Sequence, residues 1–112
     1  MKTSSAKSKG RRLQQEVAKL LAEKYELTHG VDEHFESRGM GQSGVDIGMS
    51  PTARKVCPFD IECKNKEKLS VWTEFKQAEA NTKEGRVPLL VFSRNRADTY
   101  AMLKFEDLLK LL

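Results

Sequence analysis

The chain of 112 residues is 38% hydrophobic and 32% charged, which suffices for one compact domain with a small core and makes a second core improbable on size alone. No apolar run approaches the roughly 20 residues of a membrane span, and the N-terminus lacks the apolar stretch of a signal peptide. We therefore expect an intracellular protein with no membrane partner. The net charge of +4 is uneven, because the first twelve residues hold five basic residues and no acid.

Residues 1–10 are rich in Ser, Lys and Gly, and we predict a flexible basic arm ahead of a single domain over residues 11–112. A basic segment on a nearly neutral body is typical of a protein that binds a polyanion. A solvated tail without a binding role is the alternative. The candidates for contacts with the phosphates of such a polyanion are Lys7, Lys9, Arg11 and Arg12.

From Arg11 to about Leu27, apolar residues recur at steps of three and four, which predicts an amphipathic helix. Glu16 borders the apolar stripe of this helix, where an unpaired buried carboxylate would be costly. Either Glu16 reaches into a functional site, or its side chain extends from the edge of the stripe to solvent.

A loop or short strand over residues 34–38 and a segment rich in Gly and Ser come next. Two strands are then predicted, over residues 45–49 and 59–64, joined by a connection that contains Pro51 and Pro58. In the second strand, apolar and charged residues alternate from Phe59 to Lys64. Because successive side chains of a strand point to opposite faces, we expect the apolar set to enter the core and the charged set to share the other face.

Ser70 is the expected N-cap of a second helix that runs to about Lys83. A strand over residues 87–93, a turn, a last strand from Tyr100 to Phe105 and a short C-terminal helix complete the chain. The order α-β-β-β-α-β-β-α predicts an α/β fold with a mixed sheet flanked by helices. The buried side of the second helix is expected to hold Trp72, Phe75, Ala78 and Thr82, so Trp72 is interpreted as a core residue rather than a stacking platform for a base.

Three charged residues form the candidate catalytic group. Glu62 and Lys64 lie two apart on one strand and share a face, and Asp46 lies on the preceding strand. Hydrolysis of a phosphodiester requires charge neutralisation and activation of water, which Mg²⁺ held by one or two carboxylates can supply. Lys64 would orient water or offset charge in the transition state. The alternative for Glu62 and Lys64 is an ion pair that faces solvent on an exposed strand.

The segment Gly44-Val45-Asp46-Ile47, followed by Ile61-Glu62-Cys63-Lys64, is similar to the signature of the PD-(D/E)XK nuclease superfamily. The resemblance extends over residues 11–105 and implies a restriction-endonuclease-like α-β-β-β-α-β core. It also implies a Mg²⁺-dependent endodeoxyribonuclease, with Mn²⁺ able to substitute and no small-molecule cofactor. Val45 departs from the pattern, because many members have proline there.

Within the superfamily the chain resembles the small Holliday-junction resolvases of archaeal and phage type, with a basic first helix, a Gly/Ser-rich loop before the Asp strand and the segment Gln77-Ala78-Glu79. This resemblance implies that Glu16 is a third metal ligand and that Gln77 contacts the active site, although Gln77 lies away from the expected apolar face. The same resemblance implies a homodimer that acts on branched DNA, since a twofold dimer presents two active sites to the two strands that are cut. The alternatives are a homing, restriction-like or DNA-degrading nuclease, or a noncatalytic DNA-binding module.

Several other polar residues are expected to lie outside the catalytic group. Asp60 shares a face with Glu62 but lies at the start of the strand, so a peripheral role is expected. His29 and His34 lack metal-ligand spacing, which favours roles in loops or packing. Further candidates for DNA contacts are Arg38, Ser43, Lys66, Arg94 and Arg96.

The two cysteines, Cys57 and Cys63, lack the paired spacing of a zinc site. We therefore expect free thiols in a reducing compartment.

Overall fold

The computed structural model describes residues 3–27, 34–38 and 44–112, with side chains from residue 6 onward in the first range. The predicted order of elements is confirmed, with one short helix added between the second and third strands. In chain order the elements are α1 (Thr3–Lys24), β1 (Phe35–Ser37), β2 (Ile47–Met49), α2 (Pro51–Val56), β3 (Phe59–Asn65), α3 (Val71–Asn81), β4 (Val87–Ser93), β5 (Tyr100–Met102) and α4 (Phe105–Leu111).

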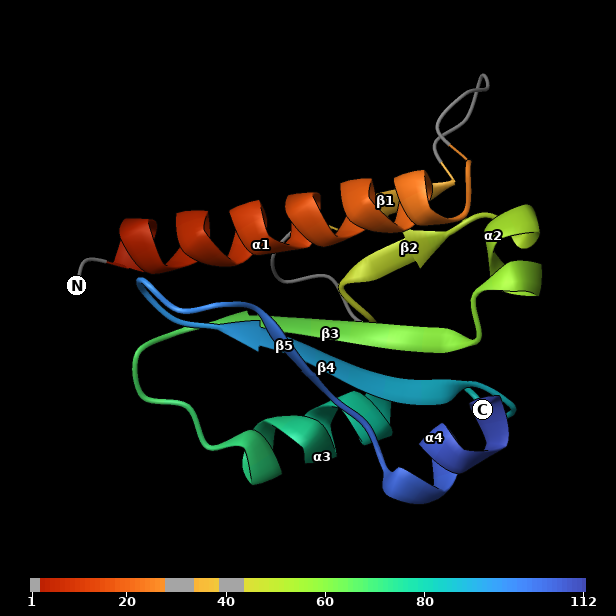
Figure 1. Ribbon diagram of the computed structural model, residues 1–112. Coiled ribbons are helices and arrows are strands. Elements are labelled where there is room, and N and C mark those ends of the chain that lie inside the picture. The colour runs from red at the N-terminus through yellow and green to blue at the C-terminus, as the bar shows by residue number, and fades with distance from the viewer. Residues whose placement is uncertain (1–2, 28–33, 39–43) are drawn as a thin grey trace.

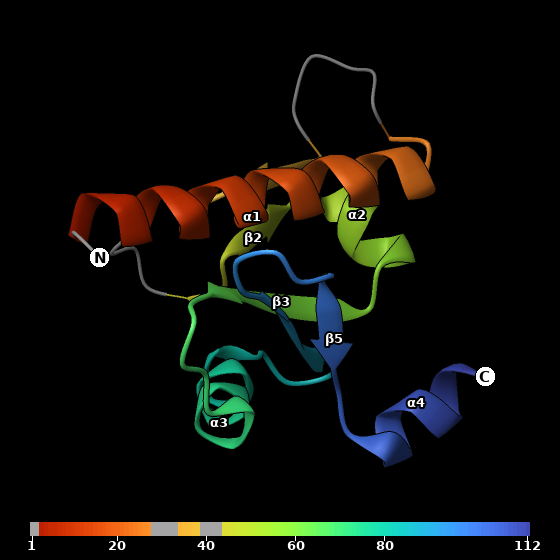
Figure 2. The same ribbon diagram turned by 60° about the vertical axis from the view of Figure 1, so that its left-hand side comes forward.

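A mixed three-stranded sheet forms the middle layer of the molecule. β3 and β4 pair in parallel along their whole length, from Phe59 opposite Val87 to Asn65 opposite Ser93, and β5 pairs antiparallel with β4. Helix α1 packs against β3 on one face of the sheet, and α3 packs against β3 and β4 on the other (Figures 1 and 2). The predicted α/β fold, a mixed sheet flanked by helices, is confirmed, and it is compatible with a restriction-endonuclease-like core.

β1 and β2 form a separate antiparallel ribbon next to this sheet. The ribbon is joined to β3 just before β2 begins, because the backbone N–H of Asp46 donates to the carbonyl of Ile61 at 3.0 Å. On its other side, the carbonyl of Asp46 accepts the N–H of Arg38 at 2.9 Å. Asp46 is thus held between β1 and β3 by its own backbone, which fixes the position of its side chain.

The main core lies between α1 and the strands. Tyr25 at the end of α1 stacks on Phe35 of β1, with ring centroids 5.8 Å apart. A smaller buried layer on the opposite face of the sheet joins Phe75 and Ala78 of α3 to Leu90 of β4. Burial of these apolar side chains is the main term that stabilises the fold. The main core contains Leu13, Val17, Ala18, Phe35, Ile47, Ala53, Cys57, Ile61, Cys63 and Val91.

The start of α1 corrects the expectation of an arm through Gly10. The helix begins at Thr3 rather than Arg11, so residues 3–10 belong to it. A helix that is nucleated on its apolar stripe adds further turns at little cost, and no proline interrupts this segment. At the other end, Glu26 adopts a left-handed φ of 57°, and the N–H of Leu27 reaches the carbonyl of Ala22 at 2.8 Å. This closure is a Schellman motif with glutamate in place of the usual glycine.

Helix α2 (Pro51–Val56) was not expected, because the segment that contains Pro51 and Pro58 was interpreted as a connection between two strands. Ser50 occupies its N-cap, and Ser50 Oγ accepts the N–H of Ala53 at 3.1 Å. Pro51 stands in the first turn, where the missing N–H costs nothing. Ser50 Oγ also lies 2.6 Å from Nδ1 of His34, so His34 has the packing role expected of it.

The interpretation of Trp72 as a core residue is wrong, since its side chain is 75% exposed. Helix α3 turns Glu74, Phe75 and Ala78 toward the sheet, whereas Trp72 lines an open hollow together with Met102 and Phe105. The last strand also ends earlier than expected, because Phe105 begins α4. Among the described helices, none has the length and the apolar composition needed to cross a bilayer.

Candidate active site

Asp46 and Glu62 approach each other although they lie on different elements. Oδ2 of Asp46 accepts the backbone N–H of Cys63 on β3 at 2.7 Å, which draws the carboxylate over that strand. Glu62 extends from β3 toward α3, and its Oε1 accepts a hydrogen bond from Nδ2 of Asn81 at 2.9 Å. The two carboxyl groups are themselves within hydrogen-bonding contact. Two oxygen-donor groups therefore meet at one point of the sheet.

The environment of Glu62 favours its protonated form. Burial raises the pKa of Glu62 to about 7, and the nearby carboxylate of Asp46 contributes to the increase. The hydrogen bond from Asn81 and the positive charge of Lys64 act in the opposite direction on this pKa. A glutamate that is 2% exposed is not part of an ion pair facing solvent, so that alternative is wrong. The reason is that β3 has a neighbouring parallel strand and helices on both faces.

Lys64 pairs with Glu74, a residue that the sequence did not indicate as part of the site. Its Nζ lies 3.6 Å from Oε2 of Glu74 on α3, and Nζ of Lys66 lies 2.7 Å from Oε1 of the same carboxylate. Glu74 is buried, and its position between two ammonium groups compensates its charge. One acidic side chain thus fixes two basic side chains that project from the end of β3 and the loop after it.

Asn81 and Glu74 are the two contributions of α3 to the site. They lie seven residues apart, about two helical turns, and so share one side of the helix. Their spacing of seven residues predicts that both lie on one side of the helix, but a polar pair at this spacing is equally typical of an exposed helix surface. Only the packing of α3 against β3 decides that this side faces the carboxylates.

Residues 5–112 match the model of the family described as "Phage putative PDDEXK endonuclease". The chain belongs to this family of phage PDDEXK endonucleases. Neither a curated protein nor a solved structure matches the chain. Membership confirms the PD-(D/E)XK superfamily and a nuclease family whose substrate is DNA, whereas the likeness to Holliday-junction resolvases stays a prediction.

In this PDDEXK endonuclease, Gln77 is exposed on the flank of the polar side of α3. By helical phase it is closer to Asn81 and Glu74 than to Trp72. Gln77 was expected to lie away from a face formed by Trp72, Phe75 and Ala78. Trp72 is exposed, but Phe75 and Ala78 are buried, so Gln77 still lies off the side of α3 that packs on the sheet.

Glu16 lies apart from the pair of carboxylates. It is exposed on α1 and lines a hollow of its own, together with Arg12 and Asn65. Within the described ranges, no three Asp, Glu, His or Cys side chains are grouped so that they could hold a metal ion. The structure therefore does not bring Glu16 to Asp46 and Glu62, and its side chain reaches solvent from the edge of the apolar stripe.

The candidate DNA contacts fall in different places. On α1, the side chains of Lys7, Arg11 and Arg12 are exposed, whereas the ammonium of Lys9 is buried without a hydrogen-bond partner among the described residues. Arg38 follows β1 and is bonded through its backbone to Asp46. Two other residues considered in the sequence, Ser43 and His29, lie outside the described residues.

Asp60 is bound by groups remote from the carboxylate pair. Nε of Arg86 lies 3.1 Å from Oδ1 of Asp60, and the N–H of Lys83 donates to Oδ2 at 3.0 Å. The expected peripheral role of Asp60 is therefore confirmed.

Both cysteines are free and buried, as expected. Burial and the adjacent carboxylates raise the pKa of the Cys63 thiol, so it stays protonated.

Proposed function

We propose that the chain is a Mg²⁺-dependent endonuclease that hydrolyses phosphodiester bonds of DNA at Asp46, Glu62 and Lys64. The observation that carries this proposal is the contact between the carboxyl groups of Asp46 and Glu62, beside the ammonium of Lys64. Two carboxylates in contact repel each other when both are ionised. A cation between them would relieve this repulsion, so the arrangement suits a metal site better than a structural one.

The donor set fits Mg²⁺ or Mn²⁺ rather than a softer metal. Asp46 and Glu62 offer only oxygen atoms, and Mg²⁺ commonly binds one or two carboxylates while it keeps several waters. When bound, the ion would lower the pKa of a coordinated water and offset charge on the phosphate. The buried thiol of Cys63 is protonated and points to the opposite face of β3, which leaves it out of the site.

The other residues act by positioning. Asn81 orients the carboxylate of Glu62 through its hydrogen bond at 2.9 Å, and Glu74 restricts Lys64 to the end of β3. An ammonium fixed in advance can stabilise the developing charge of the transition state without rearrangement. Lys66 and the exposed basic residues of α1 would bind neighbouring phosphates.

We further propose that the endonuclease is a homodimer that cleaves branched DNA, in the manner of the resolvases it resembles. Helix α4 supports the dimer because it buries none of its seven residues and exposes Phe105, Leu109 and Leu111. So short a helix is not stable in water unless its apolar face is covered. A second copy is the occupant we favour, because antiparallel α4 helices would place the acidic first turn of one opposite Lys110 of the other.

The test is cleavage by the full chain of a synthetic four-way junction, of a linear duplex with the same arm sequences and of the single strands. Wild type with Mg²⁺ should cut the junction, and a chelator should abolish cutting. Asp46→Asn should lower the rate by roughly a thousandfold while binding persists. The matched control is Glu84→Gln, an exposed acid in the turn after α3, which should cut like wild type.

The outcomes separate the alternatives. Equal cutting of junction and linear duplex would indicate a DNA-degrading or restriction-like nuclease. Binding without cutting under any metal would indicate a noncatalytic module. Full activity of Asp46→Asn would contradict the assigned site.

A further inference from the structure

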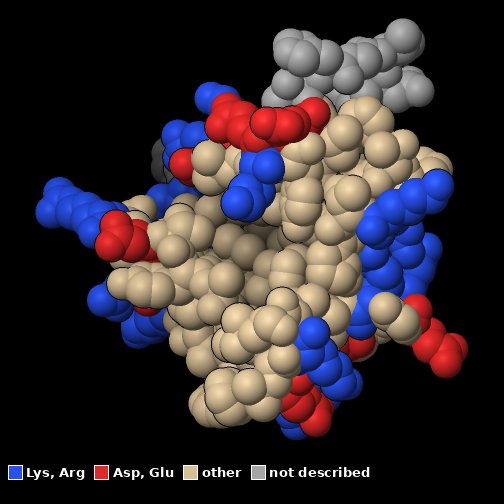
Figure 3. Space-filling model, turned by 45° about the vertical axis from the view of Figure 1, so that its right-hand side comes forward, with Lys and Arg blue, Asp and Glu red and all other residues tan. Residues whose placement is uncertain are grey.

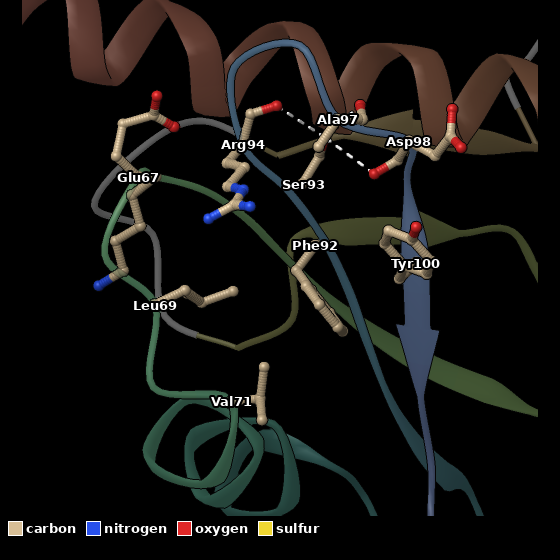
Figure 4. A pocket seen from close by; sticks show the side chains of 10 residues that line it. Glu67, Leu69, Val71, Phe92, Ser93, Arg94, Ala97, Asp98 and Tyr100 are labelled. Carbon is tan, nitrogen blue, oxygen red and sulfur yellow. Dashed lines mark hydrogen bonds between the residues drawn. The ribbon is translucent and has the colours of Figure 1, made fainter.

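A pocket separate from the carboxylate pair opens beside the C-terminal ends of β3 and β4. Its volume is about 280 Å³, and it is bounded by the loop that follows β3, the start of α3 and the turn that follows β4. Figure 4 shows Leu69, Val71 and Phe92 around the opening, with the guanidinium of Arg94 pointing into the same space. The pocket thus combines apolar walls with a cation at its rim.

Two aromatic rings form one side of this pocket. Phe92 of β4 and Tyr100 of β5 are cross-strand neighbours, and their rings stack with centroids 6.1 Å apart. Tyr100 is 57% exposed, which is unusual for a ring that lies at the rim of a cavity and does not enter the core. An exposed aromatic face beside a cation is the arrangement by which proteins bind unpaired bases.

The turn that carries Arg94 is held in place before any ligand arrives. Oγ of Ser93 lies 3.2 Å from the carbonyl of Ala97 and 3.3 Å from that of Asp98. From the other side, the carboxylate of Glu67 accepts the N–H of Asn95 at 2.9 Å, which joins this turn to the loop after β3. Because the turn is already fixed, binding of a ligand in the pocket would cost little conformational entropy of the protein.

Lys66 connects the pocket to the candidate active site. It lines the pocket, and its Nζ shares the carboxylate of Glu74 with Lys64. A phosphate bound by Lys66 would consequently lie next to the one at Lys64. Nucleotides adjacent along a strand could reach the two sites together.

We propose that this pocket binds an unpaired nucleobase next to the scissile phosphate, with the base on Tyr100 and Phe92 and its phosphate at Lys66 and Arg94. The proposal rests on the proposed nuclease function and narrows its substrate class. A base in a closed duplex is stacked on both sides and cannot enter a cavity without being unpaired. Substrates with unpaired nucleotides at a branch point, a flap or a gap are therefore preferred.

Binding of the full chain, with Ca²⁺ in place of Mg²⁺ to prevent cutting, is compared on two DNAs. One is a linear duplex, and the other has the same sequence with an unpaired strand that carries 2-aminopurine at the branch point. Tyr100→Ala should weaken binding of the branched DNA about tenfold and that of the duplex by less than about twofold. Stacking in the pocket should also quench 2-aminopurine in wild type and leave it bright in the variant.

Two control variants separate stacking from other effects. Tyr100→Phe keeps the ring and should bind like wild type. Lys68→Ala removes an exposed cation of the loop after β3 that does not line the pocket, and it should also bind like wild type. Arg94→Ala, which removes a lining cation, should weaken binding of the branched DNA.

Equal losses of binding on both DNAs for Tyr100→Ala, or no loss on either, would overturn the pocket proposal and leave the nuclease assignment intact. Absence of cutting of any DNA with Mg²⁺ or Mn²⁺ would instead overturn the nuclease assignment. The binding and fluorescence measurements do not need cleavage, so the two failures can be told apart.

Discussion

At the scale of single residues, the site depends on one carboxylate that holds two lysines. Glu74 contacts both Lys64 and Lys66, and a neutral amide at this position could not offset two positive charges. Glu74→Gln should lower kcat roughly ten- to a hundredfold through misplacement of Lys64, with little change in KM. Steady-state cleavage of the preferred DNA, with thermal unfolding recorded in parallel, measures this.

Glu79→Gln is the matched control for Glu74, because Glu79 lies on the same helix and pairs with Lys104 at the surface. Its kcat should equal that of wild type. If Glu74→Gln loses activity only in proportion to lost folded protein, its role is structural and the positioning role is refuted.

Glu62 should make the stability of the metal-free protein depend on pH. Its pKa is raised from 4.5 to about 7 in the folded state, mainly by burial. A raised pKa means that the folded state binds the proton more tightly, so the contribution is full below pH 4.5 and is lost as pH rises through about 7. The unfolding free energy should fall in this window by at most about 1.4 kcal/mol per pH unit.

Urea unfolding in the presence of a chelator, from pH 4.5 to 8, tests the contribution of Glu62. Glu62→Gln imitates the protonated form and should remove this part of the pH dependence. Mg²⁺ at pH 7.5 should stabilise wild type and leave the variant unchanged. Parallel pH profiles of the two proteins would refute the assignment to Glu62.

At the scale of elements, Arg86 connects several segments that meet at the start of β3. Its guanidinium contacts Asp60, the carbonyl of Phe59 at 2.8 Å and the carbonyl of Arg54 at 3.0 Å. Because the side chain of Asp60 is 3% exposed, loss of Arg86 would leave this buried carboxylate with only the more distant guanidinium of Arg54, at 4.0 Å, as an ion-pair partner. Arg86→Ala should lower the unfolding free energy by about 3 kcal/mol.

Two further variants check the role of Arg86. Arg86→Lys should restore only part of the stability, because an ammonium cannot make the same divergent set of bonds. Lys83→Ala, an exposed neighbour that bonds Asp60 only through its backbone, should change stability by less than about 0.5 kcal/mol. Chemical denaturation measures the unfolding free energy of the three variants. Equal stability of Arg86→Ala and wild type would contradict the proposed role of Arg86.

At the scale of the whole molecule, exposed apolar surface gathers toward the C-terminal end. The side that carries α2 and α4 in Figure 1 is largely uncharged in Figure 3, with Lys and Arg side chains along its margins. Phe105 is 70% exposed there, and Leu112 is 89% exposed. Exposed large apolar side chains within a face that carries little charge indicate an interaction surface.

The proposed dimer predicts that Phe105→Glu and Leu109→Glu weaken self-association by at least about a hundredfold. Sedimentation equilibrium measures the shift from dimer to monomer. Leu20→Glu is the matched control, since Leu20 is a similarly exposed leucine on α1. A wild-type protein that is monomeric at micromolar concentration, or unaltered association of both variants, would contradict the α4 interface.

Much of the fold could be predicted from the sequence because local pattern decides it. The alternation from Phe59 to Lys64 and the apolar run of residues 87–93 predict β3 and β4, and both are confirmed. The apolar stripe of α1 predicts the helix but not its start, since periodicity says nothing about turns that lack apolar residues. Helix α2 carried a signal in Ser50 and Pro51, but its six residues are too few for periodicity to reveal.

The candidate site divides in the same way. The sequence by itself determined that Glu62 and Lys64 share a face, because side-chain direction on a strand is a local property, and its resemblance to the PD-(D/E)XK signature added Asp46 to them. Tertiary structure alone decided that Glu74 and Asn81 complete the group, that Glu16 lies apart and that Trp72 is exposed. The rotation of a helix against a sheet depends on all the packed side chains at once, and no single segment of the chain contains that information.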